Sequence, residues 1–429
     1  MNLESSKVAV IGLGYVGLPL IIQASKKYST IGYDIDKERI NELKNNKDRT
    51  FEVSENELKE LEALFTSDSK KIRDCNIKII TVPTPINEQR QPDTKYLLHA
   101  TEIVAENIKK NDIIIYESTV YPGLTEDICM PLIEQKSKLK YNKDFFCGYS
   151  PERVNPGDSE RKIDNIIKIT SGSNDEIALI VDAFYKSIIS AGTYKAASIK
   201  VAEAAKVIEN IQRDVNIALI NEFSMIFDKI GISTKEVLDA ASTKWNFYRF
   251  DPGLVGGHCI GVDPYYLSYK AMELGIQPEM ILAGRRINEE MTSHISRYIV
   301  SKLIEIGINP INAKICILGL SFKENCPDLR NTKIIDLYSQ LLNYKCHVQI
   351  SDSIVSRSEV KKKYDIELVD LETIGKKDVI ILAVAHDTYK SINAKEIIKL
   401  IRENGIFIDI KSVFNKKDFE NTGVHYWSL

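Results

Sequence analysis

Short runs of apolar residues alternate with amphipathic stretches over the first half of the chain. A run over residues 7–11 leads into a glycine-rich turn and a helical pattern over residues 18–27, and a second run covers residues 29–33. Apolar runs of this length, bounded by polar loops, are typical of strands buried on both faces of a parallel sheet. Further runs lie at residues 77–82, 112–116 and 145–149. The pattern predicts an α/β fold with a doubly wound sheet.

The pattern changes near residue 198. From there to about residue 303 strand patterns disappear and helical periodicity dominates, interrupted by a loop rich in glycine, proline and aromatic residues over 245–264. The first apolar face of this segment consists of Val201, Ala204, Ala205 and Ile208. We expect long helices that offer a dimerisation surface.

The alternation of strands and helices returns after residue 308. Residues 314–321 repeat the opening stretch 7–14 almost position by position, and three more strands are expected at residues 347–351, 378–384 and 406–410. Ser321 replaces the second glycine of the turn and no third glycine follows, so this half is not expected to hold a dinucleotide. We predict two Rossmann-like doubly wound domains joined by a central helical segment, divided as residues 1–197, 198–308 and 309–429.

Composition narrows the class of protein. The net charge of -3 gives no basis for nucleic-acid binding. The seven cysteines include no CxxC pair, which favours a reducing, cytoplasmic compartment over a disulfide framework or a cysteine zinc site. No signal peptide is recognisable, and the longest uncharged apolar run, residues 8–22, is too short for a membrane span. We expect a soluble protein without a metal ion and without a nucleic-acid or membrane partner.

Gly12, Gly14 and Gly17 form a GxGxxG motif between the first strand and the first helix. In dinucleotide-binding folds these glycines allow the tight turn, the approach of a pyrophosphate and close packing of the helix. Asp34, at the end of the second strand, suits ribose hydroxyls and would repel a 2′-phosphate, so NAD is favoured. Arg39 nearby leaves NADP open. A glycine turn without a ligand is the alternative.

Other polar residues follow predicted strand ends, where doubly wound sheets bind ligands. Thr119 suits a substrate or a catalytic water, or it satisfies the local backbone. Glu152, held between prolines and a glycine, is a candidate base or a surface glutamate. Lys206 and Asn210 lie four residues apart on one helix face and suit an oxyanion, although a single helical lysine is usually solvated.

Cys259 lies just after two glycines, with His258 between, and precedes Asp263 by four residues. Alone, this thiol suits a metal ligand, a redox thiol or a buried cysteine. With a nucleotide cofactor it suggests an oxidation through a covalent sulfur adduct. Lys323 and Arg330 follow the second glycine turn and are cations that could reach a nucleotide-linked ligand.

Together these motifs resemble the UDP-glucose/GDP-mannose dehydrogenase family over essentially the whole chain. The chain is most similar to the branch that oxidises UDP-N-acetyl-D-glucosamine or UDP-N-acetyl-D-galactosamine to uronic acids for polysaccharide biosynthesis. The matching stretches are residues 12–19, 82–85, 117–120, 151–154, 203–210, 256–263 and 323–330.

The resemblance implies NAD-dependent four-electron oxidation of a C6 alcohol, with Cys259 carrying a thiohemiacetal and then a thioester. Lys206 and Asn210 would stabilise the oxyanion, Glu152 would assist the hydrolytic water, and Thr119 and Asp263 would hold water and the lysine. The implied cofactor contacts are Gly12, Gly14, Tyr15, Val16, Gly17, Asp34, Arg39, Pro83, Thr84, Ser118 and Thr119. The implied substrate contacts are Glu152, Arg153, Lys206, Asn210, Arg249, Gly256, Lys323 and Arg330.

Two departures from the UDP-glucose branch bear on the sugar. Val262 stands where that branch has a lysine, and Arg153 to Pro156 replace a Phe-Leu sequence with a second acidic residue. Both changes make UDP-glucose itself doubtful. The alternatives are UDP-N-acetylmannosamine or UDP-glucose as substrate, a two-electron dehydrogenase of the β-hydroxyacid type, and an NAD-binding protein without catalysis. His258, beside the thiol, is interpreted as a packing or orienting residue.

Overall fold

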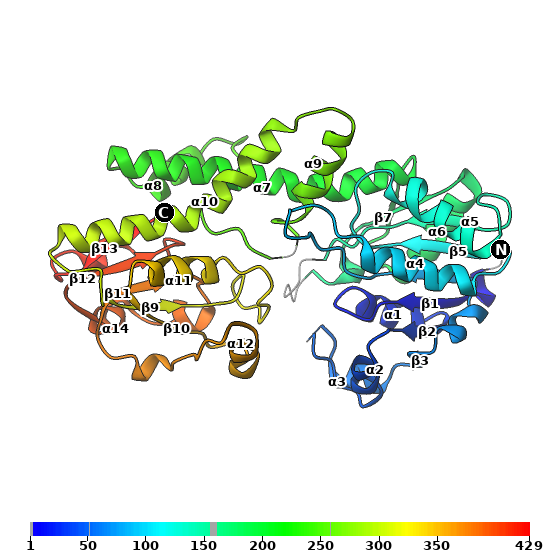
Figure 1. Ribbon diagram of the computed structural model, residues 1–429, viewed down its shortest axis with the longest axis horizontal. Helices are drawn as coiled ribbons and strands as arrows, with labels where there is room; N and C mark the ends of the chain where they lie inside the picture. The colour runs from blue at the N-terminus through cyan, green and yellow to red at the C-terminus, as the bar shows by residue number, and fades with distance from the viewer. Residues whose placement is uncertain (1–2, 51, 155–160, 258) are drawn as a thin grey trace. The chain divides into compact units, whose positions relative to one another are not determined.

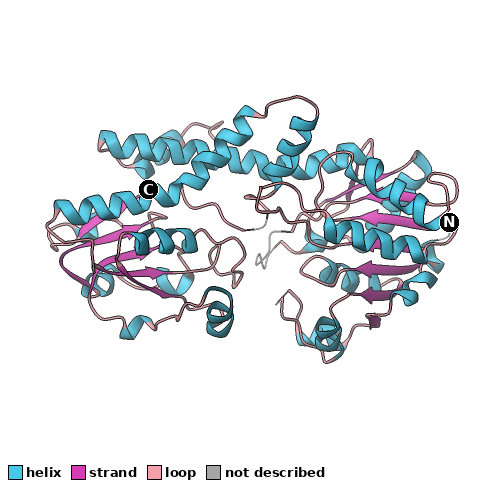
Figure 2. Cartoon of the chain, in the orientation of Figure 1, coloured by secondary structure: helices cyan, strands magenta, loops and turns pink. Residues whose placement is uncertain are grey.

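A computed structural model describes residues 3–50, 52–154, 161–257 and 259–429. The chain divides into two compact units. Unit 1 contains Met1–Glu209 and Tyr265–Gln277, and unit 2 contains Asn210–Pro264 and Pro278–Leu429. In each unit, helices flank a central sheet (Figures 1 and 2). His258 and residues 155–160 lie outside the described residues.

The described part of unit 1 has an eight-stranded sheet in the order β3-β2-β1-β4-β5-β6-β7-β8. Its pairs are parallel except for β6 with β7. The strands are β1 (Lys7–Ile11), β2 (Ser29–Tyr33), β3 (Ala63–Thr66), β4 (Ile77–Ile80), β5 (Ile113–Tyr116), β6 (Phe146–Tyr149), β7 (Lys168–Gly172) and β8 (Thr193–Lys195). The helices are α1 (Gly17–Ser25), α2 (Lys37–Lys44), α3 (Glu55–Lys59), α4 (Lys95–Asn107), α5 (Met130–Ser137), α6 (Asp175–Ile188) and most of α9 (Asp263–Glu273).

Unit 2 has, in the described residues, a parallel sheet of five strands in the order β10-β9-β11-β12-β13. The strands are β9 (Lys314–Leu318), β10 (His347–Ser351), β11 (Lys377–Leu382), β12 (Ile401–Asp409) and β13 (His425–Ser428). The helices are α8 (Thr234–Ala241), α10 (Glu279–Glu305), α11 (Ile334–Asn343), α12 (Arg357–Tyr364), α13 (Asp387–Lys390) and α14 (Ala394–Lys399). The long helix α7 (Ile199–Ile230) begins in unit 1 and continues in unit 2.

Alternation along the strands explains how the second sheet is covered on both faces. Ile315 and Ile317 of β9 pack in one core with Ile295 and Ile299 of α10. Cys316 and Leu318 point to the other face and pack with Tyr389 and Ile397, from α13 and α14. A strand buried on both faces is apolar at every position, which is why it is readable in the sequence as a continuous run.

The fold-class prediction is confirmed, whereas the predicted division at residues 197 and 308 stays a prediction. The expected apolar face at the start of α7 is not buried in the chain: Val201 is 49% and Ile208 is 53% exposed. The buried face of that turn instead carries Ala202, Glu203 and Lys206. Helical periodicity thus identifies apolar side chains on one face of a helix, but it does not show whether that face packs inside the same chain.

Candidate active site

The glycine turn after β1 leaves space for a ligand. Gly12 has a φ of +95°, and its N–H donates to the carbonyl of Tyr33 at 2.8 Å. A Cβ on Gly17, at the start of α1, would lie 1.9 Å from the Gly12 carbonyl oxygen. A Cβ on Gly14 would meet nothing within 4 Å. The fold therefore requires the first and third glycines, while the space beside the second suits the close approach of a pyrophosphate.

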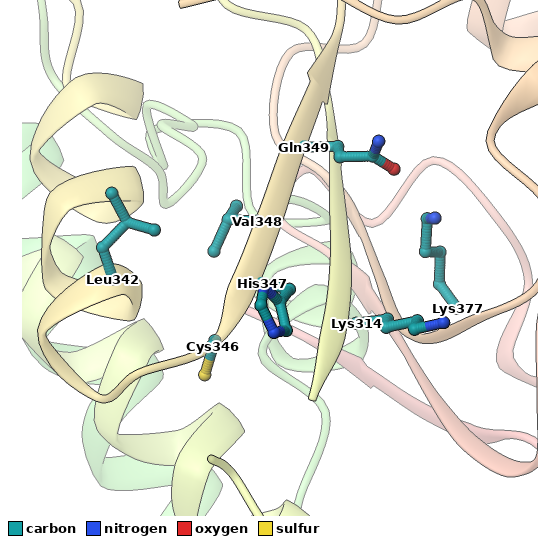
Figure 3. A pocket seen from close by; sticks show the side chains of 7 residues that line it. All are labelled: Lys314, Leu342, Cys346, His347, Val348, Gln349 and Lys377. Atoms are coloured by element: carbon teal, nitrogen blue, oxygen red, sulfur yellow. The ribbon is translucent and has the colours of Figure 1, made fainter. Parts of the chain in front are cut away.

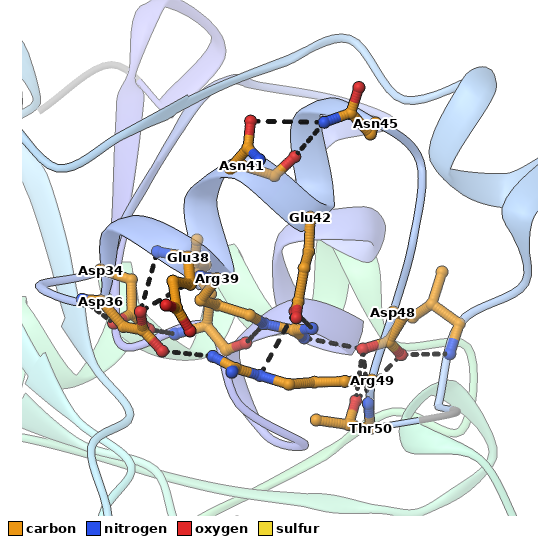
Figure 4. A network of polar contacts seen from close by, with 12 residues as sticks. Asp34, Asp36, Glu38, Arg39, Asn41, Glu42, Asn45, Asp48, Arg49 and Thr50 are labelled. Atoms are coloured by element: carbon orange, nitrogen blue, oxygen red, sulfur yellow. Dashed lines mark hydrogen bonds and ion pairs between the residues drawn. The ribbon is translucent and has the colours of Figure 1, made fainter.

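Asp34 and Arg39 both hold this turn (Figure 4). The Asp34 carboxylate accepts the N–H of Leu13 at 2.8 Å and that of Asp36 at 2.9 Å. Arg39 is buried, and its guanidinium donates to the Leu13 carbonyl at 2.8 Å and to Asp48 at 2.7 Å. The structure thus gives Arg39 a supporting position beneath the turn, and its direct contact with a cofactor stays a prediction.

Most of the other predicted residues of unit 1 follow parallel strands, which places them at the same carboxyl edge of the sheet as the glycine turn. Ser118 is buried, and its hydroxyl donates to the carbonyl of Val82 at 2.6 Å. Thr119 beside it is half-buried. The others at this edge are Tyr15, Val16, Pro83 and Thr84.

Glu152 follows β6 at this edge and is tightly held. One carboxylate oxygen accepts the N–H groups of Arg153 and Val154, each at 2.6 Å, and the other lies 3.4 Å from the ammonium of Lys168. Lys168 also lies 2.7 Å from the buried carboxylate of Glu117. Sequence reasoning gave neither Lys168 nor Glu117 a role. The signal in the sequence that could have indicated Lys168 is a lysine at the start of a short, otherwise uncharged strand.

The predicted substrate contact Arg153 is engaged with its own unit. Its guanidinium lies 2.7 Å from Glu209 and donates to the carbonyl of Ile167 at 2.8 Å. In unit 2, Arg249 is paired in the same way with Asp239 at 2.6 Å and Asp251 at 3.0 Å. Substrate contacts by these two arginines stay predictions.

Glu203 was also missed, although it lies inside a recognised stretch. It is buried on α7, and its carboxylate accepts the N–H groups of Gly123 at 2.6 Å and Thr125 at 3.1 Å. Burial raises the pKa of Glu203 to about 7, although these hydrogen bonds oppose the rise. Glu203 thus ties the start of α7 to the loop that follows Thr119.

Lys206 and Asn210 are buried one helical turn apart on α7. In unit 2, the Asn210 amide donates to the Asp263 carboxylate at 2.5 Å, and the Asp263 N–H donates to the carbonyl of Cys259 at 2.8 Å. Three predicted residues, Asn210, Asp263 and Cys259, are therefore brought together. Lys206 belongs to unit 1, and its proximity to the thiol stays a prediction.

The two glycines before Cys259 allow its loop to pack against a second predicted segment. A Cβ on Gly256 would lie 2.7 Å from the carbonyl of Asn331, and one on Gly257, where φ is +83°, would lie 2.8 Å from the ring of Phe322. The N–H of Gly257 donates to the Asn331 carbonyl at 3.4 Å. The thiol loop therefore lies against the segment 322–331, which contains the predicted substrate contacts Lys323 and Arg330.

Cys259 differs from the other six cysteines, because it is half-exposed and they are buried. Burial raises the pKa of Cys75 to about 11 and that of Cys129 and Cys316 to about 12. Since the thiolate is the nucleophile, these buried thiols are unreactive near neutral pH. Accessibility thus singles out the cysteine that the sequence motif indicates.

A cavity of about 390 Å³ lies at the opposite edge of the second sheet (Figure 3). Lys314, His347 and Lys377, which line it, begin β9, β10 and β11, so this is the amino-terminal edge of the strands. None of the predicted site residues lines this cavity. The predicted residues that follow β9 lie instead at the carboxyl edge.

Models of all three domains of one family match the chain. The NAD binding domain of the UDP-glucose/GDP-mannose dehydrogenase family matches residues 6–220, its central domain residues 200–290 and its UDP binding domain residues 316–416. The chain belongs to the UDP-glucose/GDP-mannose dehydrogenase family. It is therefore an NAD-dependent nucleotide-sugar dehydrogenase, which confirms the predicted family, enzyme class and cofactor.

Relatives cover nearly the whole chain. It is 51% identical over 415 residues to UDP-N-acetyl-D-glucosamine 6-dehydrogenase of Pseudomonas aeruginosa, covering 96% of this chain and 98% of the relative. The protein of the same name from Salmonella typhi is 50% identical over 413 residues, with 96% and 97% covered. The structure of UDP-N-acetyl-D-mannosamine dehydrogenase from Pyrococcus horikoshii superposes with a TM-score of 0.89 at 31% identity, covering 98% of both chains. None of the helices in the described ranges is long and apolar enough to cross a membrane.

Proposed function

We propose that this enzyme oxidises the C6 alcohol of UDP-N-acetyl-D-glucosamine to the carboxylate and so supplies a uronic acid for polysaccharide biosynthesis. The relatives from Pseudomonas aeruginosa and Salmonella typhi, at 51% and 50% identity, carry that substrate in their name, whereas the Pyrococcus horikoshii relative named for UDP-N-acetyl-D-mannosamine is 32% identical. Val262, in place of the lysine of the UDP-glucose branch, also favours an N-acetylated sugar over glucose.

The observation that carries the proposal is the position of Cys259 in unit 2. Its thiol is half-exposed on a loop that packs against segment 322–331, within the part that matches the UDP binding domain. A UDP-sugar held by this segment would lie beside the loop that carries the nucleophile. Asn210 and Asp263, which hydrogen bond to each other, lie at the same loop and fix its orientation.

The Gly12–Gly17 turn and Asp34 would hold NAD, and two NAD molecules bound there in turn would each accept one hydride, one for each oxidation. The Cys259 thiolate adds to the aldehyde carbon, and Lys206 and Asn210 donate hydrogen bonds to the oxyanion that develops. After the second oxidation a thioester joins Cys259 to C6. Thr119 holds a water and Glu152 takes a proton from it as its oxygen attacks the thioester carbon. The C–S bond then breaks, which releases the carboxylic acid and the Cys259 thiolate.

A panel of nucleotide sugars tests this proposal. The enzyme is incubated with NAD and, separately, UDP-N-acetyl-glucosamine, -galactosamine and -mannosamine and UDP-glucose, and NADH and acid are counted. We expect two NADH per acid, no released aldehyde and the highest kcat/KM with the gluco N-acetyl sugar. One NADH per turnover with free aldehyde would contradict the covalent route. A preference for mannosamine or for glucose would contradict the substrate assignment.

We further propose a homodimer formed through α7 and a cytoplasmic location. Four exposed apolar side chains recur at spacings of three and four residues along the unit 2 part of the helix: Leu219, Phe223, Ile226 and Ile230. Such a row is typical of a helix that packs on another helix. The free state of all seven cysteines suits a reducing compartment.

A further inference from the structure

A cluster of charged groups is buried in unit 1 beneath Glu152. Glu117 follows β5, Lys168 begins β7, and Tyr185 lies on α6. The Lys168 ammonium lies 2.7 Å from one Glu117 oxygen, and the Tyr185 hydroxyl donates to the other. The side chains of Glu117 and Lys168 are 0% and 3% exposed. The second carboxylate on this lysine is Glu152, at 3.4 Å and 12% exposed.

The charges of this cluster do not cancel. Among the described residues, two carboxylates share one ammonium, so the ionised cluster carries one negative charge in excess. Burial alone would lower the pKa of Lys168, but Glu117 and Glu152 outweigh burial and raise it, so the lysine remains charged. The shorter contact and the tyrosine hydrogen bond belong to Glu117. Glu152 has the longer contact and the greater exposure, so it is the carboxylate of the cluster that solvent can reach.

We infer that Lys168, anchored by Glu117, is a positioning residue for Glu152 in the hydrolysis of the thioester. It holds one Glu152 oxygen in place through the contact at 3.4 Å. When Glu152 takes the proton of the attacking water, the cluster becomes neutral and the repulsion between the two carboxylates is relieved. The C–S bond breaks and the proton leaves Glu152 for solvent, which restores the charged cluster. This inference rests on the proposed thioester route.

A second buried lysine in the same sheet provides a matched control. Lys78 of β4 lies 2.6 Å from Asp112, and both side chains are buried. This pair lies at the amino-terminal edge of the sheet, because Asp112 precedes β5 and Lys78 is near the start of β4. One carboxylate faces one ammonium here, and neither residue contacts Glu152 in the hydrogen bonds and ion pairs of the described residues. Replacing Lys78 and Asp112 with uncharged residues therefore measures the effect of losing a buried ion pair that does not contact Glu152.

The experiment compares Lys168→Arg, the double variant Glu117→Gln with Lys168→Met, and the control Lys78→Met with Asp112→Asn. The double variant avoids leaving Glu117 buried without a cation, which would destabilise the fold. Each variant is mixed with substrate and excess NAD. NADH formation is followed by stopped flow, acid release by quenched flow, and the acyl adduct on Cys259 by intact-protein mass.

In the double variant we expect the NADH of the first turnover to form at nearly the parent rate while acid release slows about 100-fold, the low end of a general-base contribution. The acyl adduct on Cys259 should accumulate, because Glu152 is no longer held in position for the attacking water. Lys168→Arg should retain most of the parent rate of acid release. The Lys78→Met, Asp112→Asn control should release acid at the parent rate. Normal acid release in the double variant, or equal loss of both phases without an adduct, would overturn the inference. Absence of an acyl adduct and of a second NADH in the parent enzyme would instead refute the thioester route itself.

Discussion

Replacing Gly14 or Gly17 with alanine should separate cofactor binding from folding. A Cβ at position 14 meets nothing within 4 Å, and no positive φ opposes it. Gly14→Ala should therefore leave the free energy of unfolding within about 1 kcal/mol of the parent, or slightly above it, because alanine restricts the unfolded chain. The added methyl group occupies the space predicted for the pyrophosphate, so we expect NAD affinity to fall at least tenfold, or about 1.4 kcal/mol.

The same methyl group at position 17 should act on the fold. It would lie 1.9 Å from the Gly12 carbonyl oxygen and 2.5 Å from the Thr81 hydroxyl, so α1 would have to move away from the turn. Overpacking of this kind costs about 1–3 kcal/mol. Urea unfolding measures stability, and calorimetric titration with NAD measures affinity. Parent-like NAD binding by Gly14→Ala would refute the placement of the pyrophosphate, and parent-like stability of Gly17→Ala would refute the packing argument.

Three further measurements follow from the described contacts. Iodoacetamide at pH 8 should modify Cys259 before the other thiols, as measured by peptide mass, and acid formation should be lost in parallel. Earlier labelling of Cys129 or another buried thiol would contradict the assignment. Phe223→Glu should convert a dimer to monomers in light scattering with little loss of stability, because this ring is partly exposed in the single chain; an unchanged mass would exclude α7 as the interface. Burial raises the pKa of Glu203 in the folded state to about 7, above its unfolded value of about 4.5. The free energy of unfolding should therefore fall as the pH rises from about 4.5 to 7, by at most about 3 kcal/mol. Glu203→Gln should flatten this part of the stability profile, and an unchanged slope would contradict the shift.

The parts of the site that the sequence predicted are those with local signals. The Gly12–Gly17 turn lies between a strand and a helix that are both readable from periodicity, and Thr119 and Glu152 follow buried strands whose ends are clear. The cluster beneath Glu152 has no such signal, because Lys168 and Tyr185 lie 51 and 68 residues from Glu117 along the chain. The edge strand β8 was missed for a related reason: only three residues long and largely exposed, it shows no apolar run.

Arg39 shows that proximity in sequence does not determine where a side chain lies. It lies five residues after Asp34, which suggested a cation near the ribose. However, α2 begins at Lys37 and directs the arginine beneath the glycine turn, where its guanidinium meets the Leu13 carbonyl and Asp48. The direction in which a side chain leaves a helix decides such a contact. That direction depends on how the helix packs on the sheet, which spacing alone does not determine.

The two Rossmann-like halves use the same turn but leave different groups available to a ligand. Asp352 follows β10 as Asp34 follows β2, and it accepts the N–H of Leu320 at 2.6 Å as Asp34 accepts that of Leu13. Asp352, however, is buried and also accepts hydrogen bonds from Ser321, Ile354 and Val355, with His386 at 3.2 Å.

Burial alone would raise the pKa of Asp352, but the hydrogen bonds from His386 and the backbone hold it at about 2. A carboxylate so fully occupied has no lone pair left for ribose hydroxyls, whereas the half-exposed Asp34 accepts only two N–H groups in the described contacts. At the turn itself, the Ser321 hydroxyl donates to the Lys323 carbonyl at 2.8 Å, where the first half has the open space beside Gly14. In the described residues, the space and the available carboxylate that suit a dinucleotide are therefore found at the turn of unit 1 and not at that of unit 2, where the segment 322–331 packs against the loop of Cys259.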